Sequence, residues 1–325
     1  MTDPALQAVL DRFAEAKILV LGELWLEHAV RGEATQRANG ELLVRALHRV
    51  SSAGGAGGVS SAATAMGAKT WLAGIVGQDA RAGELLRALG AAAVDPFGIV
   101  SAPGCETGEK LVLTIDDSAA SPCSRIEVEL APGPPLAGRP AQDMLDHIGA
   151  LVGQLSAVVM VAYGAPTETE TLEALARLAR SHNKLLIGGL MSDREAGEGR
   201  IRESPLPQCD LLLVAAGTVA DDEGTGDAAR DLLAKGGHAA VLVGRADGGV
   251  QLCRAGTSEI ESFANAALTG CGAWQAVVAG AAVATAAGAD PVTAARIGIG
   301  ASIVASRSGD PPTAAAIGRE LNGER

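Results

Sequence analysis

Residues 265–288 read NAALTGCGAWQAVVAGAAVATAAG, a glycine-containing turn that opens directly into a helix built almost entirely of small apolar residues. The glycines give the backbone freedom to make the turn, and Ala, Val and Gly side chains suit close packing of a helix on a sheet. The chain beyond it, through residue 324, continues as further Ala-rich helices. This stretch predicts the helical side of an α/β protein.

Short apolar runs upstream of this stretch are typical of buried parallel strands. They alternate with amphipathic segments of helical period, and that alternation favours a mostly parallel sheet with helices on both faces. We expect strands at 17–21 (KILVL), 71–76, 157–161, 184–187, 211–215 and 239–243, and helices at 59–66, 80–89, 168–181 and 228–235.

A different pattern marks a second, smaller sheet. Residues 41–50, 109–116 (EKLVLTID) and 125–130 (RIEVEL) alternate apolar and polar side chains, as half-exposed antiparallel strands do. Residues 51–58 (SSAGGAGG) are expected to form a glycine-rich turn. The patterns therefore predict an α/β fold class, a mostly parallel sheet flanked by helices, with a small separate sheet formed near 41–50 and 109–130.

Composition limits the classes of function. The 325 residues are 48% hydrophobic and 20% charged, with a net charge of −12, so a nucleic-acid partner is not expected. No run is long and apolar enough to span a membrane, and no signal peptide is recognised at the start. Five cysteines and five histidines show no metal-ligand spacing, which favours free thiols and a cytoplasmic location.

Several segments resemble the PfkB (ribokinase-like) carbohydrate kinases, most of all the heptose-phosphate kinase branch. Residues 18–27 (ILVLGELWLE) resemble its first strand, 54–58 (GGAGG) its Gly-Gly-Ala-Ala-Asn signature, and 74–90 the segment that follows. Thr269-Gly270-Cys271-Gly272-Ala273 resembles the Thr-Gly-Ala-Gly-Asp motif that opens an Ala-rich helix. The resemblance runs from residue 17 to about 321 and implies the ribokinase-like fold. That fold is one domain over 1–325, with a doubly wound, mostly parallel sheet flanked by helices. A small β lid within about 23–53 and 105–130 would cover the sugar.

The resemblance also implies a site for phosphoryl transfer. That chemistry needs a base for the acceptor hydroxyl, backbone donors for the phosphate and ATP with Mg²⁺. The implied nucleotide and phosphate site is a run just before a helix, whose N-terminus favours an anion. It comprises Thr269, Gly270, Cys271 and Gly272. The alternative is that these residues only make a tight turn into a packed helix.

The catalytic position of the motif is altered. Ala273 stands where the family has its base Asp, so no intact catalytic residue is predicted. General-base catalysis is worth about 10²–10⁴-fold, and its loss would cost roughly 3–5 kcal/mol of transition-state stabilisation. Other polar positions are altered too, at Gly58 and in the segments 188–190 and 214–216. Together these changes predict a catalytically inactive protein.

The resemblance implies a sugar site that spans the main sheet and the lid. Two of its members, Glu23 and Glu27, stand where the family has Asp. Lys110 and Arg125 would meet a sugar phosphate, or else lie on a solvated strand face. Trp274 would plug the cleft or pack in the core. The implied sugar-binding residues are Glu23, Glu27, Gly54, Gly55, Gly58, Lys110 and Arg125.

The favoured function is a pseudokinase that acts as a structural, assembly or ligand-sensing subunit, alone or with a protein partner. It is expected to be a homodimer through the lid, using Leu42, Val44, Leu111, Leu113, Ile126 and Val128, which put one apolar side on each strand. The alternative is that these residues only cover the cleft of the main domain. Two other functions stay open: an active ATP-dependent kinase of a sugar or sugar phosphate such as a heptose phosphate, and a regulator that binds nucleotide.

Overall fold

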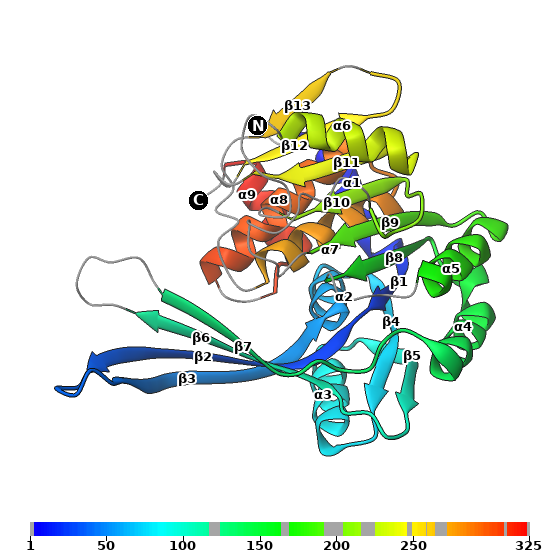
Figure 1. The fold of residues 1–325 in the computed structure, drawn as a ribbon. Coiled ribbons are helices and arrows are strands. Elements are labelled where there is room, and N and C mark those ends of the chain that lie inside the picture. The colour runs from blue at the N-terminus through cyan, green and yellow to red at the C-terminus, as the bar shows by residue number, and fades with distance from the viewer. Residues whose placement is uncertain are drawn as a thin grey trace.

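A large and a small β-sheet organise the chain (Figure 1). The computed structural model describes residues 3–116, 124–163, 169–191, 204–215, 225–245, 249–257, 259–263, 272–308 and 311–323. Within these ranges nine strands form the large sheet and four form the small one. This arrangement confirms the predicted α/β fold class.

The bounds of the elements follow the alternation expected from the sequence. The strands are β1 Lys17–Gly22, β2 Leu24–Gln36, β3 Leu42–Gly55, β4 Lys69–Gly77, β5 Asp95–Ala102, β6 Gly108–Asp116, β7 Ser124–Ala131, β8 Ala157–Ala162, β9 Leu185–Leu190, β10 Leu211–Val214, β11 Ala240–Gly244, β12 Val250–Arg254 and β13 Ile260–Phe263. The helices are α1 Pro4–Asp11, α2 Ala56–Ala65, α3 Ala80–Ala91, α4 Gly138–Leu151, α5 Thr169–Ser181, α6 Thr225–Gly236, α7 Ala273–Ala286, α8 Pro291–Ser308 and α9 Ala314–Leu321, with short 3₁₀ turns at Phe13–Glu15 and Val152–Gln154.

The large sheet has the order β13-β12-β11-β10-β9-β8-β1-β4-β5. The strands from β11 to β5 pair in parallel, and β12 and β13 add an antiparallel hairpin at one edge. The sequence patterns did not predict this hairpin or β5, because short edge strands lack a long apolar run.

Both faces of the large sheet are covered by helices, which explains its nearly continuous apolar strands. In β1, Ile18 and Val20 join a core cluster with α2, α3, α7 and α8. Leu19 and Leu21 join a second cluster with α4, α5 and α6. Successive side chains of this one strand thus pack into two separate cores, one on each face of the sheet, as in a doubly wound fold.

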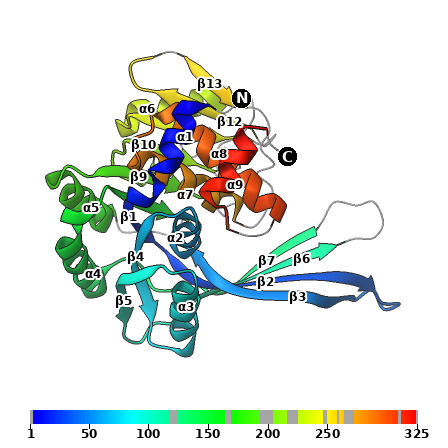
Figure 2. The ribbon, with the colours of Figure 1, turned by 180° about the vertical axis from the view of Figure 1, so that it is seen from behind.

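The small sheet, here called the lid, projects from the main body as an arm (Figures 1 and 2). Its order is β3-β2-β6-β7, with β2 and β6 parallel and the outer pairs antiparallel. Among the described residues no helix has the length and apolar character needed to cross a membrane.

The prediction of a glycine-rich turn over residues 51–58 is wrong. Residues 51–55 continue β3, and α2 begins directly at Ala56. Gly55, with φ +63°, makes the junction in a backbone conformation that other residues rarely adopt. Gly55 alone turns the chain from β3 into α2, so the other glycines of this segment serve close packing instead.

Candidate functional site

The site lies where the strand order of the large sheet reverses. After β1 the chain adds β4 and β5 on one side, and later strands add on the other side from β8. Ligands of open α/β sheets bind in the crevice at such a switch point, beyond the carboxyl ends of the strands. Glu23 follows β1 and Tyr163 follows β8, and the Tyr163 backbone N–H donates to Glu23 Oε2 at 3.0 Å.

An aromatic and cationic cluster joins the lid to this crevice. Trp25 of β2 meets Tyr163 edge to face, with ring centroids 4.6 Å apart. Lys110 Nζ of β6 lies 4.3 Å from the centroid of the Trp25 ring and 6.0 Å from that of Tyr163. Both distances allow cation–π attraction. Trp25 is only 7% exposed, so this cluster fills the space between the lid and the crevice.

The two carboxylates proposed for sugar binding already accept hydrogen bonds from the protein. Glu23 accepts from the Tyr163 backbone, and Glu27 Oε2 accepts from Trp25 Nε1 at 3.3 Å. A bound sugar hydroxyl would have to compete with these donors or share the acceptor oxygens.

The glycines that end β3 make room for Trp25. A Cβ atom at Gly54 would lie 2.0 Å from Trp25 Nε1. A Cβ at Gly55 would lie 2.7 Å from the same ring and 2.2 Å from the backbone oxygen of Glu23. These glycines are therefore explained by internal packing, without any ligand.

The start of α7 faces Gly58 of α2. The end of the Gln275 side chain fills the space over Gly58, where a Cβ would lie 2.6 Å from it. Gln275 Nε2 also donates to Tyr163 Oη at 3.2 Å. Gly272, with φ +83°, is the N-cap residue just before α7, and Ala273, the first residue of the helix, is 2% exposed. The first turn of α7 contains no acidic residue.

The structure brings most of the predicted sugar-site residues together. Glu23, Glu27, Gly54, Gly55, Gly58 and Lys110 all lie around Trp25, Tyr163 and Gln275. Arg125 pairs with Thr114 in the β6–β7 ladder, but its side chain lies outside the described residues. The predicted phosphate residues Thr269, Gly270 and Cys271 also lie outside the described ranges, which leaves Gly272.

Of the two alternatives for Trp274, plugging the cleft or packing in the core, the structure supports the second. Trp274 is half-buried and packs against the main core. Its neighbour Gln275 reaches into the crevice, together with Trp25 and Tyr163. Sequence reasoning missed these three residues, although one signal was present: Trp25 lies two positions before Glu27 and so shares its face of the strand.

The two faces of the lid differ in chemistry. Residues paired across neighbouring strands share a face. Leu113 pairs with Val30 and Ile126, and Leu111 pairs with His28 and Val128. Val44 pairs with Ala34 on the same face of β2, and Leu42 lies two residues before Val44. The six residues predicted for the lid interface therefore share one face, here called the apolar face.

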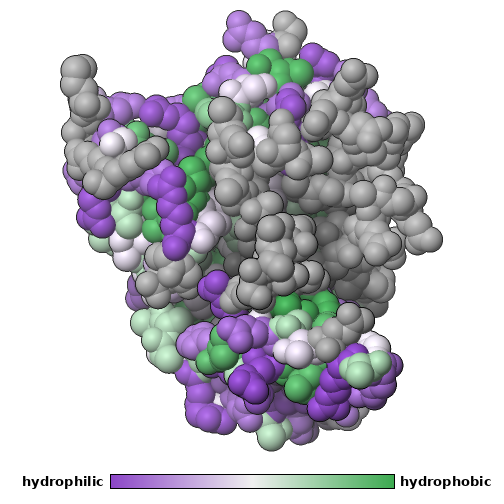
Figure 3. Space-filling view, turned by 90° about the vertical axis from the view of Figure 1, so that its left-hand side faces the viewer, coloured by the Kyte–Doolittle hydropathy of each residue, from purple (hydrophilic) through white to green (hydrophobic). Residues whose placement is uncertain are grey.

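The opposite face of the lid is charged and points toward the crevice. Glu27, Lys110 and Glu129 form one row of it, and Trp25 lies beside that row. Because Trp25 and Lys110 contact Tyr163, the apolar face points away from the crevice. The alternative that the apolar residues cover the cleft is therefore wrong. Figure 3 views the molecule from the side toward which the lid projects, where hydrophobic residues come to the surface beside hydrophilic ones.

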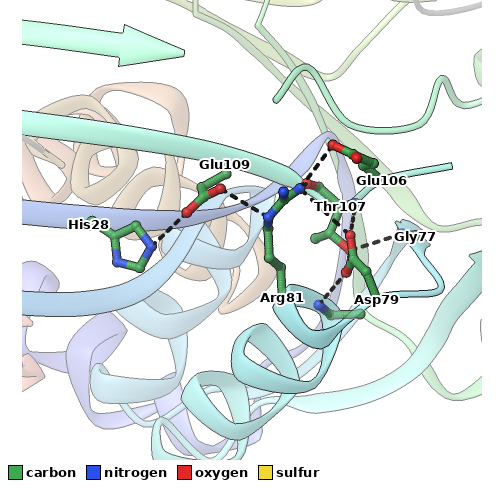
Figure 4. Close-up of polar contacts among 8 residues, drawn as sticks. His28, Gly77, Asp79, Arg81, Glu106, Thr107 and Glu109 are labelled. Atoms are coloured by element: carbon green, nitrogen blue, oxygen red, sulfur yellow. Dashed lines mark hydrogen bonds and ion pairs between the residues drawn. The ribbon is translucent and has the colours of Figure 1, made fainter. Parts of the chain in front are cut away.

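A polar network fixes the base of the lid to α3 (Figure 4). Arg81 Nε lies 3.0 Å from Glu109 Oε2, and Glu109 Oε1 lies 3.1 Å from His28 Nε2. The other His28 nitrogen lies 2.8 Å from Ser51 Oγ. The network therefore links three lid strands to one helix of the body.

Asp79 caps α3 and completes this network. Its carboxylate accepts from Ala82 N at 2.9 Å, Thr107 N at 2.8 Å and Thr107 Oγ1 at 2.7 Å. Burial raises the pKa of Asp79, but these hydrogen bonds outweigh it and leave the pKa below its ordinary value. The described residues hold no group of three or more His, Cys, Asp or Glu suited to a metal ion.

Comparison with known proteins finds sequence similarity to HldE proteins. No protein-family model matches the chain. The chain is 27% identical over 308 residues to the bifunctional protein HldE of Mesorhizobium japonicum, covering 90% of this chain and 59% of that protein. It is 26% identical over 176 residues to HldE of Helicobacter pylori, covering 53% of this chain and 37% of that one. The chain thus spans little more than half the length of the Mesorhizobium japonicum HldE protein, over which the longer match runs.

Solved structures share the architecture at low sequence identity. The microbiome-derived acarbose kinase Mak1 superposes with a TM-score of 0.72 at 17% identity, over 94% of this chain and 99% of that one. Phosphofructokinase-2 of Escherichia coli with fructose-6-phosphate gives 0.69 at 16%, over 95% and 99%. Arabidopsis thaliana ribokinase with ribose and ATP gives 0.67 at 16%, over 94% and 98%. The chain therefore has the ribokinase-like fold of the PfkB carbohydrate kinases, and its sequence is similar to HldE proteins.

Proposed function

We propose that this chain is a non-catalytic relative of the carbohydrate kinases that serves as a structural, assembly or ligand-sensing subunit. The observation that carries the proposal is the start of α7, where buried Ala273 and an acid-free first turn stand at the position of the base. Without a proton acceptor there, transfer to an alcohol loses a factor of about 10²–10⁴.

The crevice gives a second line of support. Trp25, Tyr163 and Gln275 occupy the space between the lid, α2 and α7, and they bond to one another or to the nearby carboxylates. A sugar would have to displace side chains that are packed or hydrogen-bonded. Such displacement takes binding energy that a kinase would otherwise use to position its substrate.

A coupled assay of ADP release across a panel of sugars and sugar phosphates tests the proposal. We expect no turnover above that of a chain heated to unfold it. Turnover that disappears in Glu23→Gln or Glu27→Gln would overturn the proposal and favour the alternative. That alternative is an ATP-dependent kinase of a sugar or a sugar phosphate such as a heptose phosphate, and the likeness to HldE supports it.

Nucleotide binding without transfer is compatible with the same proposal. ATP would be held by residues 269–272 and the first turn of α7, which has no side-chain cap at Gly272 and whose N-terminus favours an anion. Mg²⁺ would accompany the phosphates and neutralise their charge. Calorimetry with ATP, ADP and Mg²⁺ tests this function, and no heat at millimolar ligand would exclude it.

The partner proposed for the apolar face of the lid is a second copy of the chain. Leu42, Ile126 and Val128 on this face are 55%, 43% and 39% exposed. One amphipathic sheet needs another layer to bury its apolar side, and two lids facing each other would supply it. The proposed state is a homodimer, with a protein partner as the alternative occupant.

A further inference from the structure

Two consecutive residues of β6 hold the base of the lid from both of its faces. Neighbouring residues of a strand point to opposite sides. Glu109 therefore points toward α3, where Arg81 Nε lies 3.0 Å from its Oε2. Lys110 points toward the crevice, where its Nζ lies over the rings of Trp25 and Tyr163.

The contact on the apolar face is well shielded. The side chains of Glu109 and His28 are 19% and 10% exposed, and that of Arg81 is 33% exposed. Arg81 also reaches Glu106, but this carboxylate is 71% exposed and should contribute little. Glu109 is therefore the better shielded of these two partners of Arg81, and Asp79, 3.7 Å from Arg81 Nη1, is a third. Glu109 extends the contact to His28 of β2 (Figure 4), and His28 extends it to Ser51 of β3.

The point where the chain enters the lid is fixed as well. Thr107 precedes β6 and is completely buried. Its hydroxyl accepts from Gly77 N at 3.0 Å and donates to Asp79, and its backbone oxygen accepts from Arg81 Nη1 at 3.3 Å. A pivoting lid would have to break these bonds, which tie its entry strand to the end of β4 and the start of α3.

The contact on the crevice face reaches two further elements of the body. Trp25 packs on Tyr163 at the end of β8, and Tyr163 accepts from Gln275 of α7. Movement of the lid away from the crevice would expose the buried indole, which is costly. Movement toward the crevice is blocked by the same ring.

We infer that the lid is a fixed arm, clamped on one face by Arg81 and Glu109 and on the other by Trp25, Lys110 and Tyr163. It does not open and close over a ligand. The inference goes beyond the proposed non-catalytic function and agrees with it, because an immobile lid suits a subunit that presents a constant docking surface.

Hydrogen exchange tests the clamp on the native chain. Loss of a hydrogen bond to a charged group corresponds to about 10–100-fold faster exchange where opening is local. We expect that acceleration in β2 and β6 for Arg81→Ala and for the milder Glu109→Gln, measured by mass spectrometry. Arg87→Ala is the matched control, because Arg87 lies on the same helix and donates to Gly83 within it. Equal exchange in Glu109→Gln and wild type would overturn the clamp.

Single-molecule energy transfer tests immobility directly. Dyes placed through non-natural amino acids at Glu41 of the lid and Ala315 of α9, both exposed, would report the lid position. The doubly labelled chain is diluted into unlabelled chain. We expect one narrow distribution that ATP, Mg²⁺ and sugars leave unchanged, and a broader, shifted one when Arg81→Ala and Lys110→Ala are combined.

The two proposals fail in different ways. A wild-type distribution that shifts with ligand overturns the fixed arm, whether or not ADP is released. Sugar-dependent ADP release with an unchanged distribution overturns the non-catalytic function and leaves the fixed arm standing.

Discussion

The indole of Trp25 meets the phenol ring of Tyr163 edge to face, with centroids 4.6 Å apart and ring planes 84° apart. One ring belongs to the lid and the other to the body, so this pair is one of the contacts that join the two parts of the fold. The relationship links packing to the proposed function, because these rings lie in the crevice at the switch point of the large sheet, where open α/β sheets bind their ligands.

Replacing the indole should destabilise the chain. Trp25→Ala removes a side chain that is only 7% exposed, and we expect a loss of about 3–5 kcal/mol in the free energy of unfolding. Tyr163→Phe keeps the ring and removes the hydroxyl that accepts from Gln275, at a cost of about 1 kcal/mol. Urea denaturation measures both. Equal losses in the two variants would contradict the packing role of Trp25.

Restoring the missing carboxylate should not restore a kinase. Ala273→Asp places an acid at the start of α7, but Trp25 and Gln275 still fill the crevice. We expect no ADP release in a coupled assay across the sugar panel. Ala273→Asn serves as the control of similar size without charge. Turnover in Ala273→Asp that is absent in Ala273→Asn would show that a single substitution silenced the enzyme.

Two glycines should respond to alanine in opposite directions. A Cβ at Gly54 would collide with the buried indole, and such overpacking costs about 1–3 kcal/mol. Gly149 lies within α4 with open space around its Cβ position, so Gly149→Ala should stabilise by about 0.5–1 kcal/mol. Thermal and urea unfolding compare them. A neutral Gly54→Ala would mean that the Trp25 ring moves without cost.

The capping carboxylate of α3 should make stability depend on pH. Hydrogen bonds from Thr107 and Ala82 hold the pKa of Asp79 below its ordinary value of 3.8 despite the opposing effect of burial. Such a group stabilises the fold above its unfolded pKa, and this contribution is lost as pH falls through the folded pKa. Asp79→Asn should therefore be less stable than wild type at pH 7, and the difference should shrink below pH 3.8.

Urea titrations at several pH values measure that difference. Asp227→Asn is a suitable control, because the Asp227 side chain is 83% exposed and should contribute little at any pH. A gap between Asp79→Asn and wild type that stays constant down to acid pH would contradict the assigned role of the charge.

A charge on the apolar face of the lid should separate the proposed dimer. Ile126→Glu places a carboxylate among Leu113, Val128 and their neighbours, and we expect a monomer. Val50→Glu is the matched control: Val50 is similarly exposed, at 45%, but pairs with Ala29 on the opposite face. Light scattering after size-exclusion chromatography measures the mass. A wild-type monomer at micromolar concentration would contradict the dimer.

The sequence by itself determined the class of fold, because strand and helix periods are local properties of the chain. Apolar runs such as 17–21 and the Ala-rich segment of α7 predicted a mostly parallel sheet flanked by helices. The alternation in 109–116 predicted a small separate sheet and the shared face of Leu111 and Leu113. The sequence alone likewise shows that position 273 carries alanine and no acidic side chain.

Only the tertiary structure decided what fills the site. Trp25, Tyr163 and Gln275 lie on three elements far apart in sequence, and no local pattern says that they meet. The same holds for Arg81 and Glu109, whose pairing depends on how α3 packs against the entry of the lid. Periodicity records which side a residue faces, whereas the partner on that side is set by the packing of whole layers against one another.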